Sequence, residues 1–294
     1  MDKKVIFKGC ATALITPFWD EKIDFVALEK IIEMQISGGV DALVIGGTTG
    51  EAATLCDSER YALFEFCKDK VNGRIPLIFG TGTNDTEVAV RHTRVAEKIG
   101  CDGVLTVTPY YNKGTEDGIC AHYLKIAEAS ELPVLLYNVP TRTGVNLSYK
   151  SINALCEHPN IVGIKEASDS ADRLVTLREY SDSLSLYAGS DSQIYTTLAL
   201  GGEGVISVLS NAYPKYVADM CRLYRNGNTR EALKMQISAL GMIRALFAET
   251  NPAPIKYLMS RLGLCKNELR LPLSVANNTT RGAINAEFTL PPEE

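Results

Sequence analysis

Short apolar runs bounded by glycine or proline recur along this chain, and segments with helical periodicity separate most of them. This alternation is the pattern of repeated βα units. The runs are apolar on both faces, which suits a parallel sheet covered by helices. Eight runs can be counted, at residues 10–16, 42–46, 75–80, 103–109, 133–138, 161–165, 184–189 and 204–208.

Eight βα units within about 225 residues match a closed (β/α)8 TIM barrel better than an open doubly wound sheet. An apolar stripe over residues 25–36 predicts a helix that ends at Gly38, and Asp85 is expected to cap a helix that ends at Gly100. No glycine-rich phosphate fingerprint opens a helix after the first run, which weakens the dinucleotide-binding alternative. The predicted fold class is therefore α/β, with a (β/α)8 barrel.

The strand signals stop after residue 226, and helical segments are expected around 228–248, 252–262 and 275–287. We therefore predict a (β/α)8 catalytic barrel over residues 1–225 and a C-terminal helical region over residues 226–294. No Pro- or Ser-rich linker separates the two parts, so the helical region is expected to pack against the barrel.

The composition is that of an ordinary globular protein, with 46% hydrophobic and 22% charged residues. The formal net charge is -5 and no basic run is present, so nucleic acid is not expected as a partner. No stretch approaches the roughly 20 apolar residues that would cross a membrane, and Lys8 and Pro17 interrupt the apolar start, unlike a signal peptide. The chain is expected to work in the cytoplasm without a membrane partner.

The eight cysteines form no C-x-x-C pair, and most stand in apolar surroundings. They are expected to be buried, reduced thiols that act as small hydrophobic residues. The histidines, His92, His122 and His158, lie far apart in the sequence and are expected at the surface rather than as ligands. Neither residue type predicts a metal site.

Reactive groups in such barrels lie at the carboxyl ends of the strands. Lys165 closes the run 161–165, beside the barrel interior. Loss of solvent there favours the neutral amine, which can attack a ketone carbonyl and form an imine. An ordinary lysine could instead reach to solvent or pair with a carboxylate. Glu166 should project to the opposite face and be structural.

Two further features could serve such a lysine. Tyr137 ends a run one barrel position before Lys165, near enough to pass protons to a bound substrate, although a core tyrosine would look the same. The turn GGTTGE (46–51) offers backbone N–H groups and the hydroxyls of Thr48 and Thr49, which can hold a small carboxylate. Turns rich in Gly and Thr are also common connectors.

Arg142 lies in a proline-bounded loop just beyond Tyr137, where its guanidinium could clamp a second carboxylate. A solvated loop arginine is the alternative. A phosphate site of the usual barrel type would need glycines after the seventh and eighth runs, whereas Gly201 and Gly202 precede the eighth. A phosphorylated substrate is therefore disfavoured.

Three segments together, GGTTGE (46–51), YNVPTRTG (137–144) and VGIKEAS (162–168), resemble the pyruvate-dependent class I aldolases, the family of dihydrodipicolinate synthase and N-acetylneuraminate lyase. The resemblance covers the whole chain, and Lys165 follows Tyr137 by 28 positions, 165 minus 137. The double threonine and the P-T-R-T-G context favour the dihydrodipicolinate synthase branch, in which pyruvate condenses with L-aspartate 4-semialdehyde.

The resemblance implies that Lys165 forms a covalent imine with pyruvate and that neither a metal nor another cofactor is needed. The enamine derived from it would attack the aldehyde carbon, and the adduct would cyclise to 4-hydroxy-tetrahydrodipicolinate, an intermediate of diaminopimelate and lysine biosynthesis. The other implied roles are proton transfer for Tyr137, the pyruvate carboxylate for Thr48 and Thr49, the semialdehyde carboxylate for Arg142, and backbone contacts to the pocket for Gly189 and Ile206.

Tyr110 and Tyr111 match the paired tyrosines of the same family. The resemblance implies that Tyr111 enters the site of a neighbouring subunit and completes a proton relay through Thr48 to Tyr137. A shared site implies an oligomer, and the family is typically a homotetramer built as a dimer of dimers.

Family members that lysine inhibits usually carry histidine where Arg60 stands and glutamate where Val88 stands. A cation at Arg60 should repel a cationic ligand, so we expect weak or absent lysine inhibition. The rest of the matching region consists of Ala52, Ala53, Asp57, Asn84 and Tyr110.

Two alternatives stay open. The nearer one is another pyruvate-forming aldolase of the family, such as an N-acetylneuraminate lyase or a 2-keto-3-deoxy-sugar-acid aldolase, against which Arg142 argues. The other is a barrel that has lost catalysis and serves as a binding or regulatory protein, since a fold does not fix a function.

Overall fold

A computed structural model describes residues 3–168, 170–180 and 183–288. Eight parallel strands form a closed barrel in the order β1-β10-β9-β8-β7-β6-β5-β4, which confirms the predicted fold class. Each strand overlaps one of the predicted apolar runs, because side chains buried on both faces leave no polar alternation. The strands are β1 (Gly9–Ala13), β4 (Ala42–Ile45), β5 (Leu77–Gly80), β6 (Gly103–Val107), β7 (Val134–Asn138), β8 (Ile161–Glu166), β9 (Ser185–Ala188) and β10 (Gly204–Ser207).

Helices follow the barrel strands, and the residues predicted to cap or end helices do so in the structure. The Asp85 carboxylate accepts hydrogen bonds from two backbone N–H groups of the first turn of α3, and Gly100 ends that helix at φ 88°. The helices are α1 (Phe25–Ser37), α2 (Asp57–Val71), α3 (Thr86–Ile99), α4 (Glu116–Ala127), α5 (Pro140–Thr143), α6 (Tyr149–Leu155), α7 (Ala171–Leu177), α8 (Ile194–Ala199), α9 (Pro214–Arg225), α10 (Thr229–Leu246), α11 (Ala253–Arg261) and α12 (Asn278–Ala286), with short 3-10 turns η1 (Ala52–Thr54), η2 (Arg178–Tyr180), η3 (Asp191–Gln193) and η4 (Leu209–Asn211).

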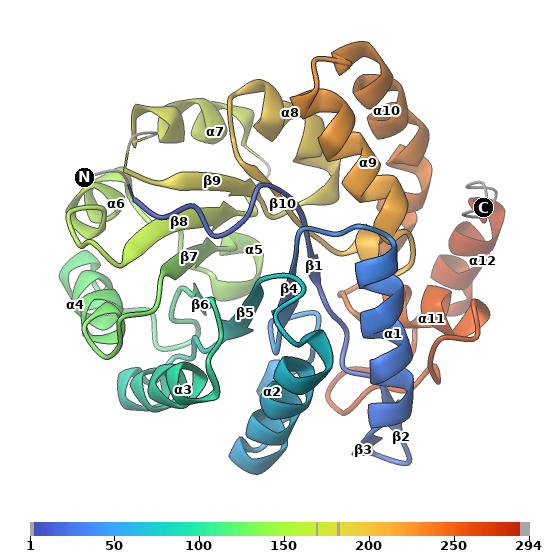
Figure 1. Cartoon of the computed structure of the whole chain (residues 1–294), viewed down its shortest axis with the longest axis horizontal. Coiled ribbons are helices and arrows are strands. Elements are labelled where there is room, and N and C mark those ends of the chain that lie inside the picture. Colours follow the sequence, from blue (N-terminus) through green and yellow to red (C-terminus); the bar gives the residue numbers. More distant parts are fainter. Residues whose placement is uncertain (1–2, 169, 181–182, 289–294) are drawn as a thin grey trace. The chain divides into compact units, whose positions relative to one another are not determined.

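The chain divides into two compact units. The first comprises residues 1–8 and 76–206. In it β5 to β9 lie side by side, with α3, α4, α6 and α7 on their outer side (Figure 1). This unit therefore holds the strand ends at which Lys165 and Tyr137 were predicted.

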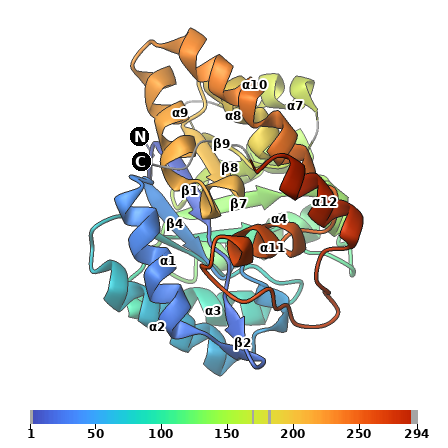
Figure 2. The same cartoon turned by 90° about the vertical axis from the view of Figure 1, so that its right-hand side faces the viewer.

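The second unit comprises residues 9–75 and 207–294. In it β1 pairs with β4, α9 packs on β1, and α10, α11 and α12 pack on one another (Figures 1 and 2). The three C-terminal helices occupy the predicted helical segments. The boundary predicted near residue 226 falls between α9 and α10, which are in contact, and the division into domains at that point stays a prediction.

A small antiparallel hairpin, β2 (Phe18–Trp19) with β3 (Lys22–Ile23), was not predicted from the sequence. The two residues of its turn, Asp20 and Glu21, have φ angles of 53° and 61°. Two-residue hairpin turns of this kind usually carry glycine or asparagine, so Asp-Glu gives little signal.

The surface position expected for two histidines is wrong. His92 and His122 are buried, at 2% and 5% exposure, because each lies on the inner face of its helix, α3 or α4. The His122 imidazole is 2.9 Å from the Thr86 hydroxyl, and burial lowers its pKa to about 4. It is therefore neutral at ordinary pH. His158 is half-buried.

The burial predicted for the cysteines holds for most of them. Cys10, Cys67, Cys101, Cys156 and Cys221 are buried, whereas Cys120 and Cys265 are half-buried and Cys56, at the start of α2, is exposed.

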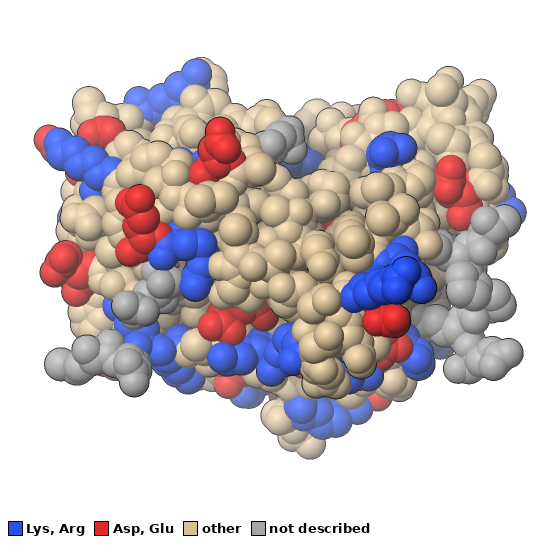
Figure 3. All heavy atoms as spheres, turned by 90° about the horizontal axis from the view of Figure 1, so that it is seen from above, with Lys and Arg blue, Asp and Glu red and all other residues tan. Residues whose placement is uncertain are grey.

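Over the described ranges, no cluster of three or more His, Cys, Asp or Glu side chains is arranged to hold a metal ion. In the same ranges, no helix has the length and apolar character needed to cross a membrane. Basic and acidic side chains are interspersed on the face drawn in Figure 3, so neither sign of charge dominates it.

Candidate active site

Lys165 and Tyr137 lie side by side in the first unit. The parallel register of β7 and β8 pairs the two residues, which places both side chains on the same face of the sheet. The Lys165 Nζ is 4.4 Å from the centre of the Tyr137 ring, and the two residues are 5% and 7% exposed. A lysine that reaches to solvent would not be this buried. The structure also brings together the amine and the phenol that the sequence indicated.

The next residues along both strands face the other way and form a buried polar network. The Glu166 carboxylate accepts hydrogen bonds from Arg173 Nε at 2.8 Å, from Asn138 Nδ2 at 2.9 Å and from the Ser168 N–H at 3.0 Å. Arg173 also donates to the Leu147 carbonyl at 2.8 Å. The structural role expected for Glu166 is confirmed by these contacts.

Asn138 extends this network into the loop that carries Arg142. Its side chain accepts from the Leu147 N–H at 3.0 Å and donates to Asn146 Oδ1 at 2.8 Å. Arg142 itself lies exposed on the single turn α5, which ends at Gly144 with φ 67°. Asn138 was not predicted as a site residue, although its place directly after Tyr137 on an alternating strand put it on the outer face.

Gly189 and Ile206 stand where β9 and β10 end. The Gly189 N–H donates to the Glu166 carbonyl at 2.7 Å, and a Cβ at this position would lie 2.5 Å from that of Ala167. Only glycine fits there without displacing the backbone. Because this N–H is engaged, a backbone contact from Gly189 to a ligand would come from its carbonyl. Ile206 is fully buried.

Tyr111 lies in the turn after β6 and is 88% exposed. Its φ of 70° is a left-handed conformation that a residue with a Cβ seldom adopts. The turn is held by the Asn112 N–H, which donates to the Tyr110 carbonyl at 2.9 Å, and by the Asn112 side chain, which donates to the Asn84 carbonyl at 2.8 Å.

Thr48 and Thr49 belong to the second unit, in the turn that follows β4. The turn is closed by hydrogen bonds from Gly50 N–H to Gly47 O and from Glu51 N–H to Thr48 O, both 3.1 Å long. Thr48 is half-buried, and Thr49 is buried with its hydroxyl oxygen 2.9 Å from Asn251 Nδ2.

Glu51 ends this turn in a buried ion pair that was not predicted from the sequence. Its carboxylate forms an ion pair with Lys256 and accepts a hydrogen bond from the Arg270 N–H at 3.0 Å. The Lys256 ammonium lies 4.1 Å from the centre of the Phe18 ring. Residues 51, 256 and 270 are far apart in sequence, so no local pattern could have joined them.

Arg60, from the region compared with lysine-binding relatives, is buried in α2 and donates from Nη2 to the Ala52 carbonyl at 2.7 Å. Val88 is half-buried in α3. A guanidinium is therefore held at the start of α2, next to the turn η1.

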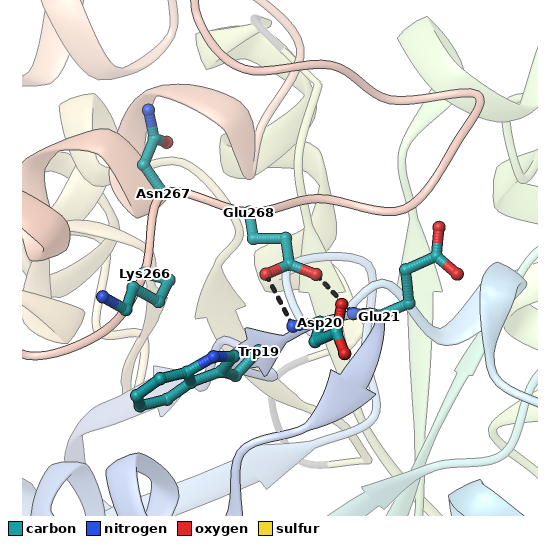
Figure 4. Close-up of a pocket in the computed structure, with 6 residues that line it drawn as sticks. All are labelled: Trp19, Asp20, Glu21, Lys266, Asn267 and Glu268. Atoms are coloured by element: carbon teal, nitrogen blue, oxygen red, sulfur yellow. Dashed lines mark hydrogen bonds between the residues drawn. The ribbon is translucent and has the colours of Figure 1, made fainter.

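An open pocket of about 620 Å³ lies between the β2–β3 hairpin and residues 266–268 (Figure 4). The Glu268 carboxylate accepts hydrogen bonds from the N–H groups of Asp20 and Glu21, and the Lys266 ammonium is 4.8 Å from the centre of the Trp19 ring. None of the predicted site residues lines this pocket, so it is distinct from the candidate active site.

The chain is similar to known proteins along almost its whole length. The family model described as "Dihydrodipicolinate synthetase family" matches residues 6–289. A 4-hydroxy-tetrahydrodipicolinate synthase from Clostridium novyi (strain NT) is 48% identical over 269 residues, which is 91% of each chain.

Two solved structures carry the comparison to the fold. The 4-hydroxy-tetrahydrodipicolinate synthase of Methylacidiphilum fumariolicum SolV has a TM-score of 0.94 at 40% identity, covering 97% of this chain and 95% of that one. A structure described as a monomeric dihydrodipicolinate synthase variant has a TM-score of 0.93 at 39% identity, covering 96% of each chain. With a match along almost its whole length, the chain belongs to the dihydrodipicolinate synthetase family, whose members are class I aldolases that use no cofactor.

Proposed function

We propose that this chain condenses pyruvate with L-aspartate 4-semialdehyde to 4-hydroxy-tetrahydrodipicolinate, the first committed step of diaminopimelate and lysine biosynthesis, and is therefore a lyase. The observation that carries the proposal is the buried Lys165 beside Tyr137, at the carboxyl ends of adjacent barrel strands, in a member of this family. Relatives along the whole chain bear the name of this activity.

The chemistry begins with the Lys165 amine, which attacks the ketone carbon of pyruvate and expels water to form an imine. The imine acidifies the methyl group of pyruvate, and loss of one proton gives an enamine. The enamine carbon forms the new bond to the aldehyde carbon of the second substrate, whose oxygen becomes a hydroxyl. The amino group of the semialdehyde then displaces Lys165, which closes the ring and frees the enzyme.

The neighbouring side chains supply protons and charge. Tyr137 passes protons between the amine and the substrate through its hydroxyl, and the position of Lys165 Nζ 4.4 Å from the centre of the Tyr137 ring supports this role. Thr48 and Thr49 bind the pyruvate carboxylate, and Arg142 binds the carboxylate of the semialdehyde from its exposed loop. Backbone atoms of Gly189 and Ile206 line the substrate site around Lys165.

We take the homotetramer, arranged as a dimer of dimers, from the family, and the exposure of Tyr111 supports only a contact with a second copy. An 88% exposed tyrosine on a left-handed turn is suited to enter a second copy, where it would complete the relay through Thr48. A structure of a monomeric variant exists among the relatives, so the assembly has to be measured for this chain, by sedimentation. A cytoplasmic location also stays a prediction from the sequence.

The test is borohydride reduction in the presence of pyruvate, followed by mass spectrometry. Lys165 should carry a stable pyruvyl adduct, and Lys165→Met should carry none. An unmodified wild-type protein would favour the barrel without catalysis. Turnover of aspartate semialdehyde and of keto-deoxy sugar acids, compared in one assay, separates this activity from that of the related lyases.

A further inference from the structure

The hydroxyl of Thr49 has a buried partner outside its own turn. Asn251 Nδ2 donates to Thr49 Oγ1 at 2.9 Å, and the two residues are 5% and 3% exposed. Because the hydroxyl oxygen accepts from the amide, the hydroxyl proton is directed elsewhere and can be donated. A carboxylate only accepts hydrogen bonds, so a threonine hydroxyl that binds one must present its proton. Asn251 thus sets the direction in which Thr49 acts.

The far end of the same turn is also anchored. Glu51 has φ 53° and ψ 37°, a left-handed conformation that a glutamate keeps only when its surroundings hold it. Its carboxylate forms an ion pair with Lys256, and both side chains are fully buried. Lys256 Nζ also donates to the Glu268 carbonyl at 2.9 Å. The Lys256 ammonium therefore ties Glu51 to residues near the C-terminus.

Both anchors come from one short segment. Asn251 and Lys256 are five positions apart, 256 minus 251, where α11 begins. Asn251 bonds to the side chain of Thr49 within the turn, and Lys256 pairs with the side chain of Glu51, the last residue of the turn. Glu51 in turn donates its N–H to the Thr48 carbonyl at 3.1 Å, so an anchored Glu51 restrains the two threonines.

We propose that Asn251 and Lys256 are positioning residues for pyruvate, holding the turn 46–51 so that Thr49 presents its hydroxyl proton to the pyruvate carboxylate. This inference deepens the proposed function and rests on it. The residues at the start of α11 would then contribute to substrate binding as well as to packing.

The first experiment is a double-mutant cycle between Asn251→Ala and Thr49→Val. Each single variant should raise the KM for pyruvate about tenfold, a change of about 1.4 kcal/mol. The kcat and the KM for aspartate semialdehyde should change little. If Asn251 acts through the Thr49 hydroxyl, Asn251→Ala should have no further effect in the Thr49→Val background.

Asn160→Ala is the matched control. Its amide donates to the carbonyls of Ala127 and Ser130 at 3.1 and 3.0 Å, at the amino end of β8. Loss of these bonds should lower the melting temperature and leave the KM for pyruvate unchanged. An equal rise in that KM for Asn160→Ala would show that any weakened fold has this effect, and would overturn the proposal.

Lys256→Met alone leaves a buried carboxylate without its cation and is expected to destabilise the fold. The pair Lys256→Met with Glu51→Gln removes both charges, and the amide oxygen of the introduced glutamine can still accept from the Arg270 N–H. The double variant should fold yet have a raised KM for pyruvate, since the ion pair between residues 51 and 256 no longer restrains the end of the turn. A folded double variant with the wild-type KM would overturn the role of Lys256.

Borohydride trapping measured against pyruvate concentration distinguishes failure of this inference from failure of the proposed function. Wild-type enzyme should be modified at Lys165, and the variants should need about tenfold more pyruvate for half-modification. Modified wild type with the same half-saturation in every variant would overturn the inference and leave the proposed function standing. Wild type that pyruvate never modifies would overturn both.

Discussion

Lys165 differs from an ordinary lysine at a strand end in two ways that act on its chemistry. It is withdrawn from solvent, and its Nζ lies against the face of a tyrosine ring. The sequence predicted the position of both residues, since each ends an apolar run. The burial of His122 could not be predicted in the same way, because one histidine in a mixed apolar stripe is compatible with either face of a helix.

The phenol of Tyr137 can be tested apart from its ring. Tyr137→Phe keeps the ring over which Lys165 lies and removes the hydroxyl, so kcat should fall by about 10²- to 10⁴-fold while the imine still forms. Steady-state kinetics together with borohydride trapping would measure both effects.

Tyr187 offers the control for Tyr137, because it is the register neighbour of Lys165 on the other side, in β9. Its hydroxyl donates to the Phe7 carbonyl at 2.8 Å and is not free for catalysis. Tyr187→Phe should cost about 1 kcal/mol of stability and leave kcat nearly unchanged. Equal losses of kcat in the two variants would argue against a specific role for Tyr137.

His122 predicts an acid-sensitive contribution to stability. Burial lowers its pKa from 6.5 to about 4, so the unfolded chain takes up a proton at a higher pH than the folded chain does. The stability linked to neutral His122 is complete above pH 6.5 and is lost as the pH falls toward 4, by at most about 3 kcal/mol. Urea unfolding between pH 7.5 and 5 should show a shallower loss for His122→Asn than for wild type. Parallel curves would contradict this assignment.

At the scale of the elements, the strands were predictable because each buried run carries its own signal along the chain. The contacts behind them were not, because Asn138, Glu166 and Arg173 come from three separate segments and meet only after the strands have paired. The β2–β3 hairpin was missed for a local reason, a turn without glycine or asparagine. The turn 46–51 was predicted to be a binding loop, which stays a prediction, and its anchors at the start of α11 depend on tertiary contact.

The network behind β7 and β8 should stabilise the strand ends more than a surface ion pair does. Arg173→Met leaves the fully buried Glu166 carboxylate without its cation and should cost about 3 kcal/mol, whereas the double variant with Glu166→Gln should recover part of that loss. Lys215→Met breaks an exposed pair with Asp219 and should cost less than about 1 kcal/mol. Urea midpoints for the three variants would measure the difference, and similar losses for Arg173→Met and Lys215→Met would refute a special role for the buried pair.

At the scale of the whole molecule, eight alternating βα units predicted the barrel, because this number of units within about 225 residues is typical of closed barrels. The strand tilt and register that closure also needs leave no signal along the chain. The assembly of several copies could not be read in this way, since an exposed side chain such as Tyr111 does not by itself show what covers it. Regulation by a small molecule that binds between copies depends on the same unknown contacts. The charge of the residues in the region compared with lysine-inhibited relatives is what predicts it here.

Lysine, the end product of the proposed pathway, should be a weak inhibitor here. Arg60 keeps its charge while bonded to the Ala52 carbonyl, and Val88 supplies no carboxylate to bind an ammonium group. Steady-state rates should therefore change little at micromolar lysine, and inhibition in that range would contradict the argument. Arg60→His combined with Val88→Glu removes one cation and adds one anion. This variant should bind lysine more tightly than wild type, by calorimetry, whereas Val88→Gln, which adds similar bulk without charge, should not.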